Sequence, residues 1–201
     1  MCMVSYDLER ELTTLEHIVL GLISEEPQSG YSIIGALELG THRWSASPGS
    51  IYPILKRLEK LGCIAGELEM VYETRPRKMY RLTPLGEQLL DAWLRGPLSW
   101  NEVLDERDVA LTKFLFMEKR LAREEVLDWL DNYEKLTVSY DAPRRVFHEA
   151  LMRGSSLHKQ LIHEVTLMEL NMQRTWIQMA RARLKADRQR EPESDASSPI
   201  D

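Results

Sequence analysis

The segment from Ser47 to Gly62 constrains the fold of this chain more than any other, because it has the pattern of a short, capped helix. Ser47 suits the N-cap, since its side-chain oxygen can accept a hydrogen bond from a backbone N–H. Pro48 suits the first helical position, where no hydrogen bond is needed, and Gly62 suits the position that ends the helix. The sequence therefore predicts a helix with defined ends.

This predicted helix has one apolar side and one polar, cationic side. The apolar residues are Ile51, Ile54, Leu55, Leu58 and Leu61, and the residues opposite them are Gly49, Pro53, Lys56 and Lys60, flanked by Tyr52 and Arg57. We expect the apolar side to pack on a core. The other side could enter a DNA major groove and contact base edges and phosphates, or it could simply be solvated.

The flanking sequence predicts two helices before this segment and a hairpin after it. Apolar residues recur at helical spacing within 12–23, residues 27–30 break the pattern, and a second helix runs from about 30 to 39. The alternation of residues 67–70 indicates a strand with one solvated face, and 79–82 form a second strand after a turn at 73–78. Three helices followed by a hairpin predict a winged helix-turn-helix.

Three stretches resemble the signature of the PadR family of bacterial transcriptional regulators. They are Gly30-Tyr31, then Ser47-Pro-Gly-Ser-Ile-Tyr-Pro-Ile-Leu-Lys-Arg-Leu-Glu59, then Arg77-Lys-Met-Tyr-Arg-Leu-Thr-Pro-Leu-Gly86, within a match of roughly 12–86. The resemblance implies a homodimer that binds a pseudo-palindromic operator in double-stranded DNA, usually to repress, and that an effector releases. In the larger members, which this chain resembles, the helical C-terminal region dimerises.

Seven predicted DNA contacts lie on the two helices of this motif: Tyr31, Ser47, Ser50, Tyr52, Lys56, Arg57 and Lys60. Tyr31 begins the second helix, where free N–H groups favour a phosphate, although its ring could instead pack against the third helix. The serines and Tyr52 are candidates for groove and backbone contacts. The three basic residues are expected at phosphates, with Glu38 or Glu59 as alternative partners of Arg57.

Three further predicted contacts lie in the hairpin: Arg75, Arg77 and Lys78, which straddle Pro76. A proline stiffens the tip, so less entropy is lost when the tip lies along a minor groove. A solvated loop is the alternative interpretation of the same residues.

Charge indicates a local rather than a general affinity for DNA. The chain has 26 basic and 32 acidic side chains and a formal net charge of −6. Residues 41–60 and 73–81 nevertheless each carry four basic residues against one acidic residue. Binding should therefore weaken steeply with salt, while the acidic remainder limits non-specific binding. The acidic total also permits a different class of function, a winged-helix module that binds a protein and no operator.

We expect a mainly α chain in two domains, a winged helix-turn-helix of three helices and a two-stranded wing at 8–95 and an all-helical domain at 96–184. The proposed joint is 95–98, after a fourth helix at about 84–94, and residues 185–201 have the polar composition of a disordered tail. Two cysteines, Cys2 and Cys63, form no disulfide framework and fit a reducing cytoplasm. The sequence contains no apolar run of the ~20 residues needed to cross a membrane and no export signal.

The C-terminal half carries two heptad-like stripes of apolar or small residues. One is Leu161, Val165, Met168, Met172, Thr175, Met179 and Ala182, and the other is Val126, Leu130, Tyr133, Thr137 and Tyr140. A dimer that reads two half-sites would use such a surface, whereas packing of the two stripes on each other is the alternative. Residues 108–117 predict one more buried helix.

An aromatic effector is a possible partner, but the sequence assigns it no site. The candidate lining residues are Trp100, Trp129, Trp176, Phe114, Phe116, Phe147 and the methionines of the last helix, and core packing explains them equally. We expect no cofactor and no metal site, because His158 and His163 lie about 140° apart on a helix. The sequence offers no nucleophile with a base and no phosphate-binding glycine loop, so an enzyme is not expected.

Overall fold

The computed structural model describes residues 11–39, 47–70, 76–152 and 154–187. Its elements are α1 (Thr14–Glu25), β1 (Gln28–Ser29), α2 (Gly30–Leu39), α3 (Pro48–Lys60), β2 (Ile64–Met70), β3 (Pro76–Leu82), α4 (Pro84–Arg95), α5 (Trp100–Leu104), α6 (Arg107–Met117), α7 (Arg123–Met152) and α8 (Leu157–Asp187). The contacts divide the chain into two compact units, Met1–Gly96 with Asp105–Leu121, and Pro97–Leu104 with Ala122–Asp201.

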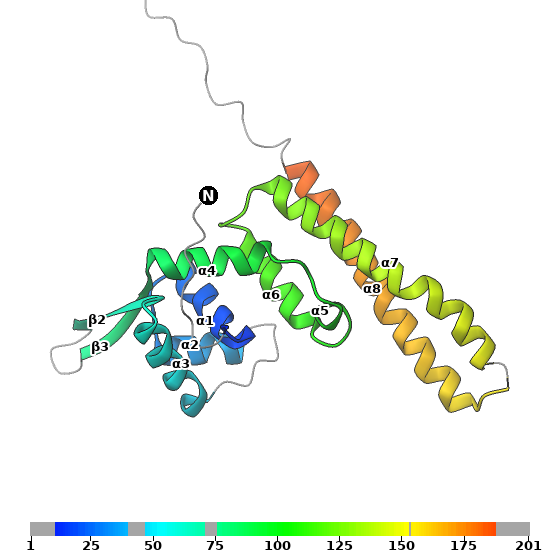
Figure 1. Ribbon diagram of the computed structural model, residues 1–201, viewed down its shortest axis with the longest axis horizontal. Helices are drawn as coiled ribbons and strands as arrows, with labels where there is room; N and C mark the ends of the chain where they lie inside the picture. Colours follow the sequence, from blue (N-terminus) through cyan, green and yellow to red (C-terminus); the bar gives the residue numbers. More distant parts are fainter. Residues whose placement is uncertain (1–10, 40–46, 71–75, 153, 188–201) are drawn as a thin grey trace, which may run out of the picture. The chain divides into compact units, whose positions relative to one another are not determined.

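The first unit is a winged helix-turn-helix, as predicted, and Figure 1 shows α1, α2 and α3 grouped at the base of the β2–β3 hairpin. Its core is formed by side chains that are almost completely buried: Ile18, Val19, Leu20, Ile33, Ile51, Leu55, Leu58, Ile64 and Leu90. The expected apolar side of α3 thus faces inward. Burying such side chains contributes roughly 1.5–3 kcal/mol each relative to leaving them in water.

The ends of α3 follow the sequence prediction closely. Ser47 is the N-cap in extended conformation, its N–H donates to Ser50 Oγ over 3.1 Å, and Pro48 is the first helical residue. At the other end Gly62 has φ of +72° and its N–H donates to Glu59 O, so it makes the left-handed turn that ends the helix. Local signals therefore set both boundaries of α3.

The sheet has one strand more than the predicted two-stranded wing. Its order is β1-β3-β2, all antiparallel, and the two residues of β1 pair with β3 through Gln28↔Tyr80 and Ser29↔Met79. Residues 27–30 were expected to be only a break between helices. Gln28 and Ser29 instead cover the edge of β3, which would otherwise expose unpaired N–H and C=O groups.

The first stretch of the first unit ends at Gly96, next to the predicted boundary, but α6 also belongs to this unit, whereas the sequence analysis assigned it to the helical domain at 96–184. Phe116 packs on α1 where Gly21 has no side chain, since a Cβ there would lie 2.1 Å from Phe116 Cε2. Trp93 of α4 stacks on His17 of α1, with ring centroids 4.9 Å apart, and the Lys113 Nζ lies 5.0 Å from its ring centroid. The helix predicted at 108–117 is thus buried, but against the winged helix.

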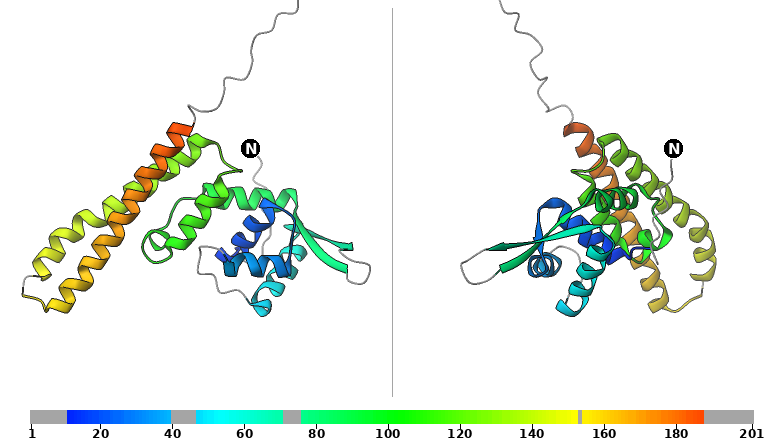
Figure 2. Two further views of the ribbon diagram at one scale, coloured as in Figure 1. Left: turned by 180° about the vertical axis from the view of Figure 1, so that it is seen from behind. Right: turned by 60° about the vertical axis from the view of Figure 1, so that its left-hand side comes forward.

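The second unit contains α7 and α8, which lie side by side in both views of Figure 2. The stripe of α7 is buried at Val126, Leu130, Tyr133 and Thr137, whereas the side chain of Tyr140 lies outside the described part. The helix α8 continues to Asp187, so the first three residues of the predicted tail are helical. The rest of that tail, 188–201, lies outside the described residues. None of the described helices has the length and apolar character needed to cross a membrane.

Candidate nucleic-acid interface

The polar side of α3 is open to solvent, as a recognition helix requires. Ser47, Tyr52, Lys56 and Lys60 are all exposed, opposite the buried Ile51, Leu55 and Leu58. Within the described residues, the structure pairs neither the Lys56 nor the Lys60 ammonium group with an anion. Both charges therefore remain available to an anionic partner.

The two candidate tyrosines occupy different environments. Tyr31, at the start of α2, is 79% exposed, so its ring does not pack against α3 as the alternative interpretation had it. Tyr52 is the ring that lies between the helices: a Cβ on Gly30 would approach its Cε1 to 2.7 Å, although Tyr52 is still 51% exposed. Tyr31 is consequently accessible to a phosphate, and that contact stays a prediction.

The serines at the start of α2 bind each other. The Ser29 N–H donates to Ser32 Oγ over 2.9 Å, and the Ser32 N–H donates to Ser29 Oγ over 3.1 Å. Arg77 of the wing also donates to Ser29 Oγ. This reciprocal cap fixes the N-terminus of α2, beside which Tyr31 projects.

Arg57 pairs with a residue that the sequence analysis did not consider. Its Nη1 lies 2.8 Å from Glu16 Oε1 in α1, and Glu16 is only 1% exposed. The other carboxylate oxygen of Glu16 accepts from the Thr13 N–H over 2.7 Å, completing a capping box. The Thr-x-x-Glu pattern could have identified this cap from the sequence, but not its partner 41 residues away. Neither Glu38 nor Glu59, the alternatives considered, is the partner seen here.

The described cations of the wing are also engaged within the protein. Lys78 Nζ lies 2.8 Å from the Glu59 carboxylate of α3, and Arg81 Nη2 lies 3.3 Å from Glu69 Oε1. The hydrogen bond to Glu59 raises the pKa of Lys78 above its ordinary value. Arg75, the predicted contact at the tip, lies outside the described residues. The structure thus separates the open lysines of α3 from the paired cations of the wing.

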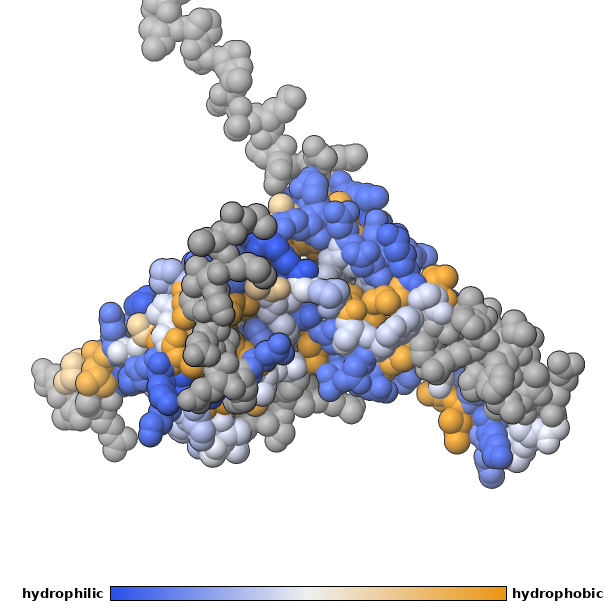
Figure 3. Space-filling view, viewed as in Figure 1, coloured by the Kyte–Doolittle hydropathy of each residue, from blue (hydrophilic) through white to orange (hydrophobic). Residues whose placement is uncertain are grey.

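The heptad stripe of α8 is exposed along its whole length, in contrast to that of α7. All seven of its residues lie at the surface, from Leu161 to Ala182, and Met168 is 65% and Met179 45% exposed. The residues of α8 that are buried in the unit belong to another side of the helix: Leu170, Gln173, Ile177 and Ala180. In Figure 3 apolar side chains reach the surface where α8 begins, at the lower right. Packing of the two predicted stripes on each other is therefore not what the structure shows.

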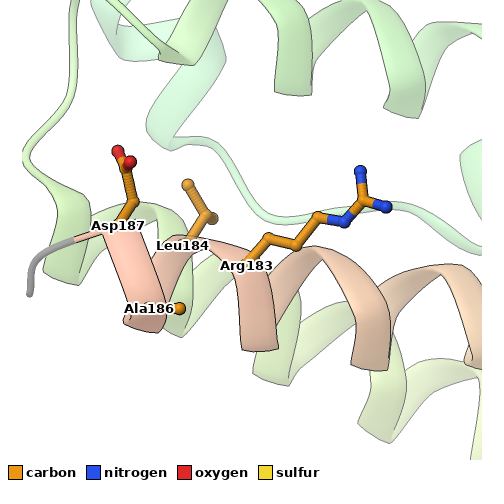
Figure 4. A pocket seen from close by; sticks show the side chains of 4 residues that line it. All are labelled: Arg183, Leu184, Ala186 and Asp187. Atoms are coloured by element: carbon orange, nitrogen blue, oxygen red, sulfur yellow. The ribbon is translucent and has the colours of Figure 1, made fainter. Parts of the chain in front are cut away.

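Packing accounts for three of the six candidate effector-lining aromatics, whereas Trp100 is 45% exposed and Phe114 is half-buried. Phe116 is buried in the first unit, while Trp129, Tyr133 and Trp176 form an edge-to-face row with centroids 5.4 Å and 6.3 Å apart. The side chain of Phe147 lies outside the described part. Figure 4 shows a hollow at the end of α8 lined by Arg183, Leu184, Ala186 and Asp187, none of which is aromatic. This hollow is lined by none of the candidate aromatic residues.

Metal-ligand clusters are also absent from the described part of the chain, where no three His, Cys, Asp or Glu side chains are grouped to hold an ion. His158 is exposed, and the side chain of His148 lies outside the description.

Comparison with known proteins matches the first unit to one family. Residues 19–92 match the family described as "Transcriptional regulator PadR-like family". The "Negative transcriptional regulator PadR" of Bacillus subtilis (strain 168) is 38% identical over 85 residues, which are 41% of this chain and 46% of that protein. The "Transcriptional regulator Rv3488" of Mycobacterium tuberculosis is 43% identical over 53 residues, 26% and 49% of the two chains. The match thus spans about half the length of these relatives.

Solved structures of similar proteins include two from Bacillus species. B. subtilis PadR in complex with operator DNA is 25% identical, with 87% of this chain and 99% of that chain covered, at a TM-score of 0.44. The PadR-like regulator BC4206 of Bacillus cereus is 32% identical, with 49% and 91% covered, at a TM-score of 0.38.

Proposed function

The chain belongs to the PadR-like family of transcriptional regulators, and from this premise we propose that it is a dimeric repressor that binds a pseudo-palindromic operator through α3. The observation that carries the proposal is the exposed pair of lysines on α3, Lys56 and Lys60, which lie opposite the buried Ile51, Leu55 and Leu58. The B. subtilis relative is described as a negative regulator, which supports repression. The family is one of regulators and not of enzymes.

The proposed operator contacts follow from exposure and charge. Ser47, Ser50 and Tyr52 lie at the leading end of α3, where small side chains let a helix approach base edges. Lys56 and Lys60 are proposed to neutralise phosphates along the groove, because both ammonium groups face solvent. Tyr31 would donate to a phosphate at the N-terminus of α2, whose backbone N–H groups favour an anion.

The wing is proposed to contribute mainly through Arg75 and Arg77. In the free protein Arg77 donates to Ser29, close to Tyr31, so its guanidinium group lies near the phosphate proposed for that tyrosine. Arg57 would contribute little net attraction, since its charge is compensated by Glu16. These assignments divide the ten predicted contacts into open groups and compensated groups.

The second copy is proposed to bind along the exposed stripe of α8. A heptad stripe of apolar side chains that is solvated in one chain is the kind of surface that a coiled-coil partner covers. Half-sites about 34–36 Å apart, one turn of DNA, require a partner held at a fixed distance. An identical chain satisfies both demands, because a two-fold symmetric protein matches a palindromic operator.

Release of the operator by a small aromatic effector is proposed on the family resemblance, and with it a cytoplasmic location. A thermal shift of the purified protein with a panel of phenolic acids, planar cations and divalent metals tests the effector. A rise in Tm with one class of compound supports an effector of that class. No shift in Tm with any compound would contradict release of the operator by an effector of these classes.

The experiment that tests the function is selection of a duplex from a random library by the purified protein, followed by footprinting. We expect a selected site with two inverted half-sites about one helical turn apart, protected on one face of the duplex. Recovery of no common sequence, together with binding no tighter than to calf thymus DNA, would overturn the proposal. That result would favour the alternative, a winged-helix module for a protein partner.

A further inference from the structure

The contact between the end of α3 and the wing is more elaborate than an ordinary surface ion pair. The Lys78 ammonium group lies 2.8 Å from each oxygen of the Glu59 carboxylate. Glu59 is the penultimate residue of α3, and Lys78 lies in β3, 19 residues further along the chain. The pair therefore joins the proposed recognition helix directly to the wing.

Gly66 makes room for this pair. It lies in β2, directly opposite Tyr80 in the sheet. A Cβ at this position would lie 2.2 Å from Lys78 Cε and 2.9 Å from Glu59 Oε1, distances at which both groups would have to move. The missing side chain thus lets the lysine stem and the carboxylate lie over the strand.

Tyr80 forms the third side of the arrangement. The Lys78 Nζ lies 5.4 Å from the centroid of its ring, within range of a cation–π interaction. Tyr80 is itself buried in the first unit, so its ring is a fixed surface. The Lys78 side chain is thereby held between the Glu59 carboxylate and the Tyr80 ring, and it occupies the space that Gly66 leaves open over β2.

The charges of the pair argue against a phosphate contact by Lys78. While Lys78 and Glu59 are paired, their charges cancel, and the pair attracts a phosphate only weakly. If Lys78 moved to a phosphate, Glu59 would be left as an unpaired anion on a helix that faces a polyanion, which is unfavourable.

From this geometry we propose that Lys78 is a positioning residue: with Glu59 over Gly66 it forms a latch that fixes the wing relative to α3, and it does not itself contact the operator. The inference rests on the proposed DNA binding and concerns the same surface. The charge of Lys78 and its place in the wing predicted a DNA contact, and the inference assigns this residue a positioning role instead.

The test compares Lys78→Gln, Glu59→Gln, Gly66→Ala and the Glu59/Lys78 double variant with the wild type. The probe is the duplex that the wild type selects from a random library, and affinity is measured by fluorescence anisotropy over a series of salt concentrations. Two controls are matched in chemistry: Glu69→Gln removes the β2 carboxylate that pairs with Arg81, and Lys60→Gln removes a proposed phosphate contact.

The latch predicts the same result for all three single variants. Each should weaken binding by about two- to fivefold, the range of an exposed ion pair, and leave the salt slope as in the wild type. The double variant should bind no more weakly than the weaker single variant, because one interaction is lost in each case. Lys60→Gln should reduce the slope by about 0.9 per subunit, and Glu69→Gln should leave affinity nearly unchanged.

A phosphate contact by Lys78 predicts a different salt slope for Lys78→Gln and the opposite change in affinity for Glu59→Gln, and these results would overturn the inference. Lys78→Gln would then reduce the salt slope by about 0.9 per subunit, and Glu59→Gln would tighten binding by removing a repulsive charge. Gly66→Ala is informative here because it changes no charge.

A second measurement separates this inference from the proposed function. Thermal unfolding of the same variants without DNA should show non-additive effects of Glu59→Gln and Lys78→Gln at low salt. Additive effects would overturn the latch even where the operator is bound. Failure of the wild type to select any duplex would instead overturn the proposed function, and the unfolding cycle would still decide whether the latch exists.

Discussion

Arg57 of α3 donates to Glu16 of α1 over 2.8 Å, and so ties the proposed recognition helix to the carboxylate that caps the first helix. Glu16 is completely buried, whereas Arg57 is partly accessible. Breaking such a pair leaves a carboxylate in a poorly hydrated site with one cationic partner fewer, which is costly.

We expect Arg57→Met to lower the free energy of unfolding by about 2 kcal/mol, less than for a fully buried pair because Arg57 is partly solvated. Urea unfolding followed by circular dichroism measures the change. Lys56→Met, at the neighbouring exposed position, should change the stability by less than about 0.5 kcal/mol. Equal changes in the free energy of unfolding for the two variants would show that the contact with Glu16 does not stabilise the fold.

Stability should fall as the pH falls from about 6.5 to about 4, because burial lowers the pKa of His17 to about 4. In this window the unfolded chain takes up a proton at His17 that the folded chain does not, so the unfolded state is favoured as the pH decreases. A shift of this size corresponds to about 3 kcal/mol at most.

The measurement is Tm at pH 7.5 and pH 5 for the wild type and for His17→Asn. The variant should lose less stability between the two pH values than the wild type, since it lacks the titrating ring that stacks on Trp93. An identical loss in both proteins would assign the pH dependence to other groups.

The exposed stripe of α8 predicts that a charge placed in it abolishes self-association. Met172→Glu should convert the proposed dimer to a monomer in analytical ultracentrifugation, because covering the stripe would bury an unpaired carboxylate. Asn171→Glu, at an exposed position beside the stripe, is the control and should stay dimeric. A wild-type protein that sediments as a monomer at micromolar concentration would contradict the assignment of the surface.

Cys63 should be a slowly reacting thiol. Its side chain is buried, and burial raises the pKa of the thiol, so little thiolate is present and access is poor. In a Cys2→Ser background, the rate of reaction with Ellman's reagent should rise sharply when urea unfolds the protein. Rapid reaction of the native protein, at the rate of free cysteine, would be inconsistent with the packing described.

The parts of the fold that the sequence predicted well are those with local causes. The start of α3 at Ser47-Pro48 and its end at Gly62 depend on a few adjacent residues, and the apolar spacing between them determines which side is buried. The hairpin itself was also predicted, and its return leads directly into α4. The alternation at 67–70 did not mark a buried face, however, since Leu68 is 72% and Met70 65% exposed. Arg77 and Lys78, which were predicted in the turn, lie in β3.

The features that the sequence did not reveal depend on contacts between distant residues. Nothing near Arg57 indicates that its partner is Glu16, and nothing near 105–121 indicates that α6 packs on α1. Periodicity also could not distinguish the two stripes of the second unit: both have heptad spacing, but that of α7 is buried within the unit and that of α8 is exposed. Spacing identifies an apolar side and does not identify what covers it.

The central claim, that the lysine side of α3 contacts DNA phosphates, is tested most directly by the salt dependence of operator affinity in a Lys56→Gln/Lys60→Gln double variant. In a dimer the two substitutions remove four proposed phosphate contacts, so the slope of log affinity against log salt should become shallower by about 3.6. Lys185→Gln, at an exposed lysine of α8, serves as the control and should leave the slope unchanged. A double variant with the wild-type slope and the wild-type affinity would contradict the account.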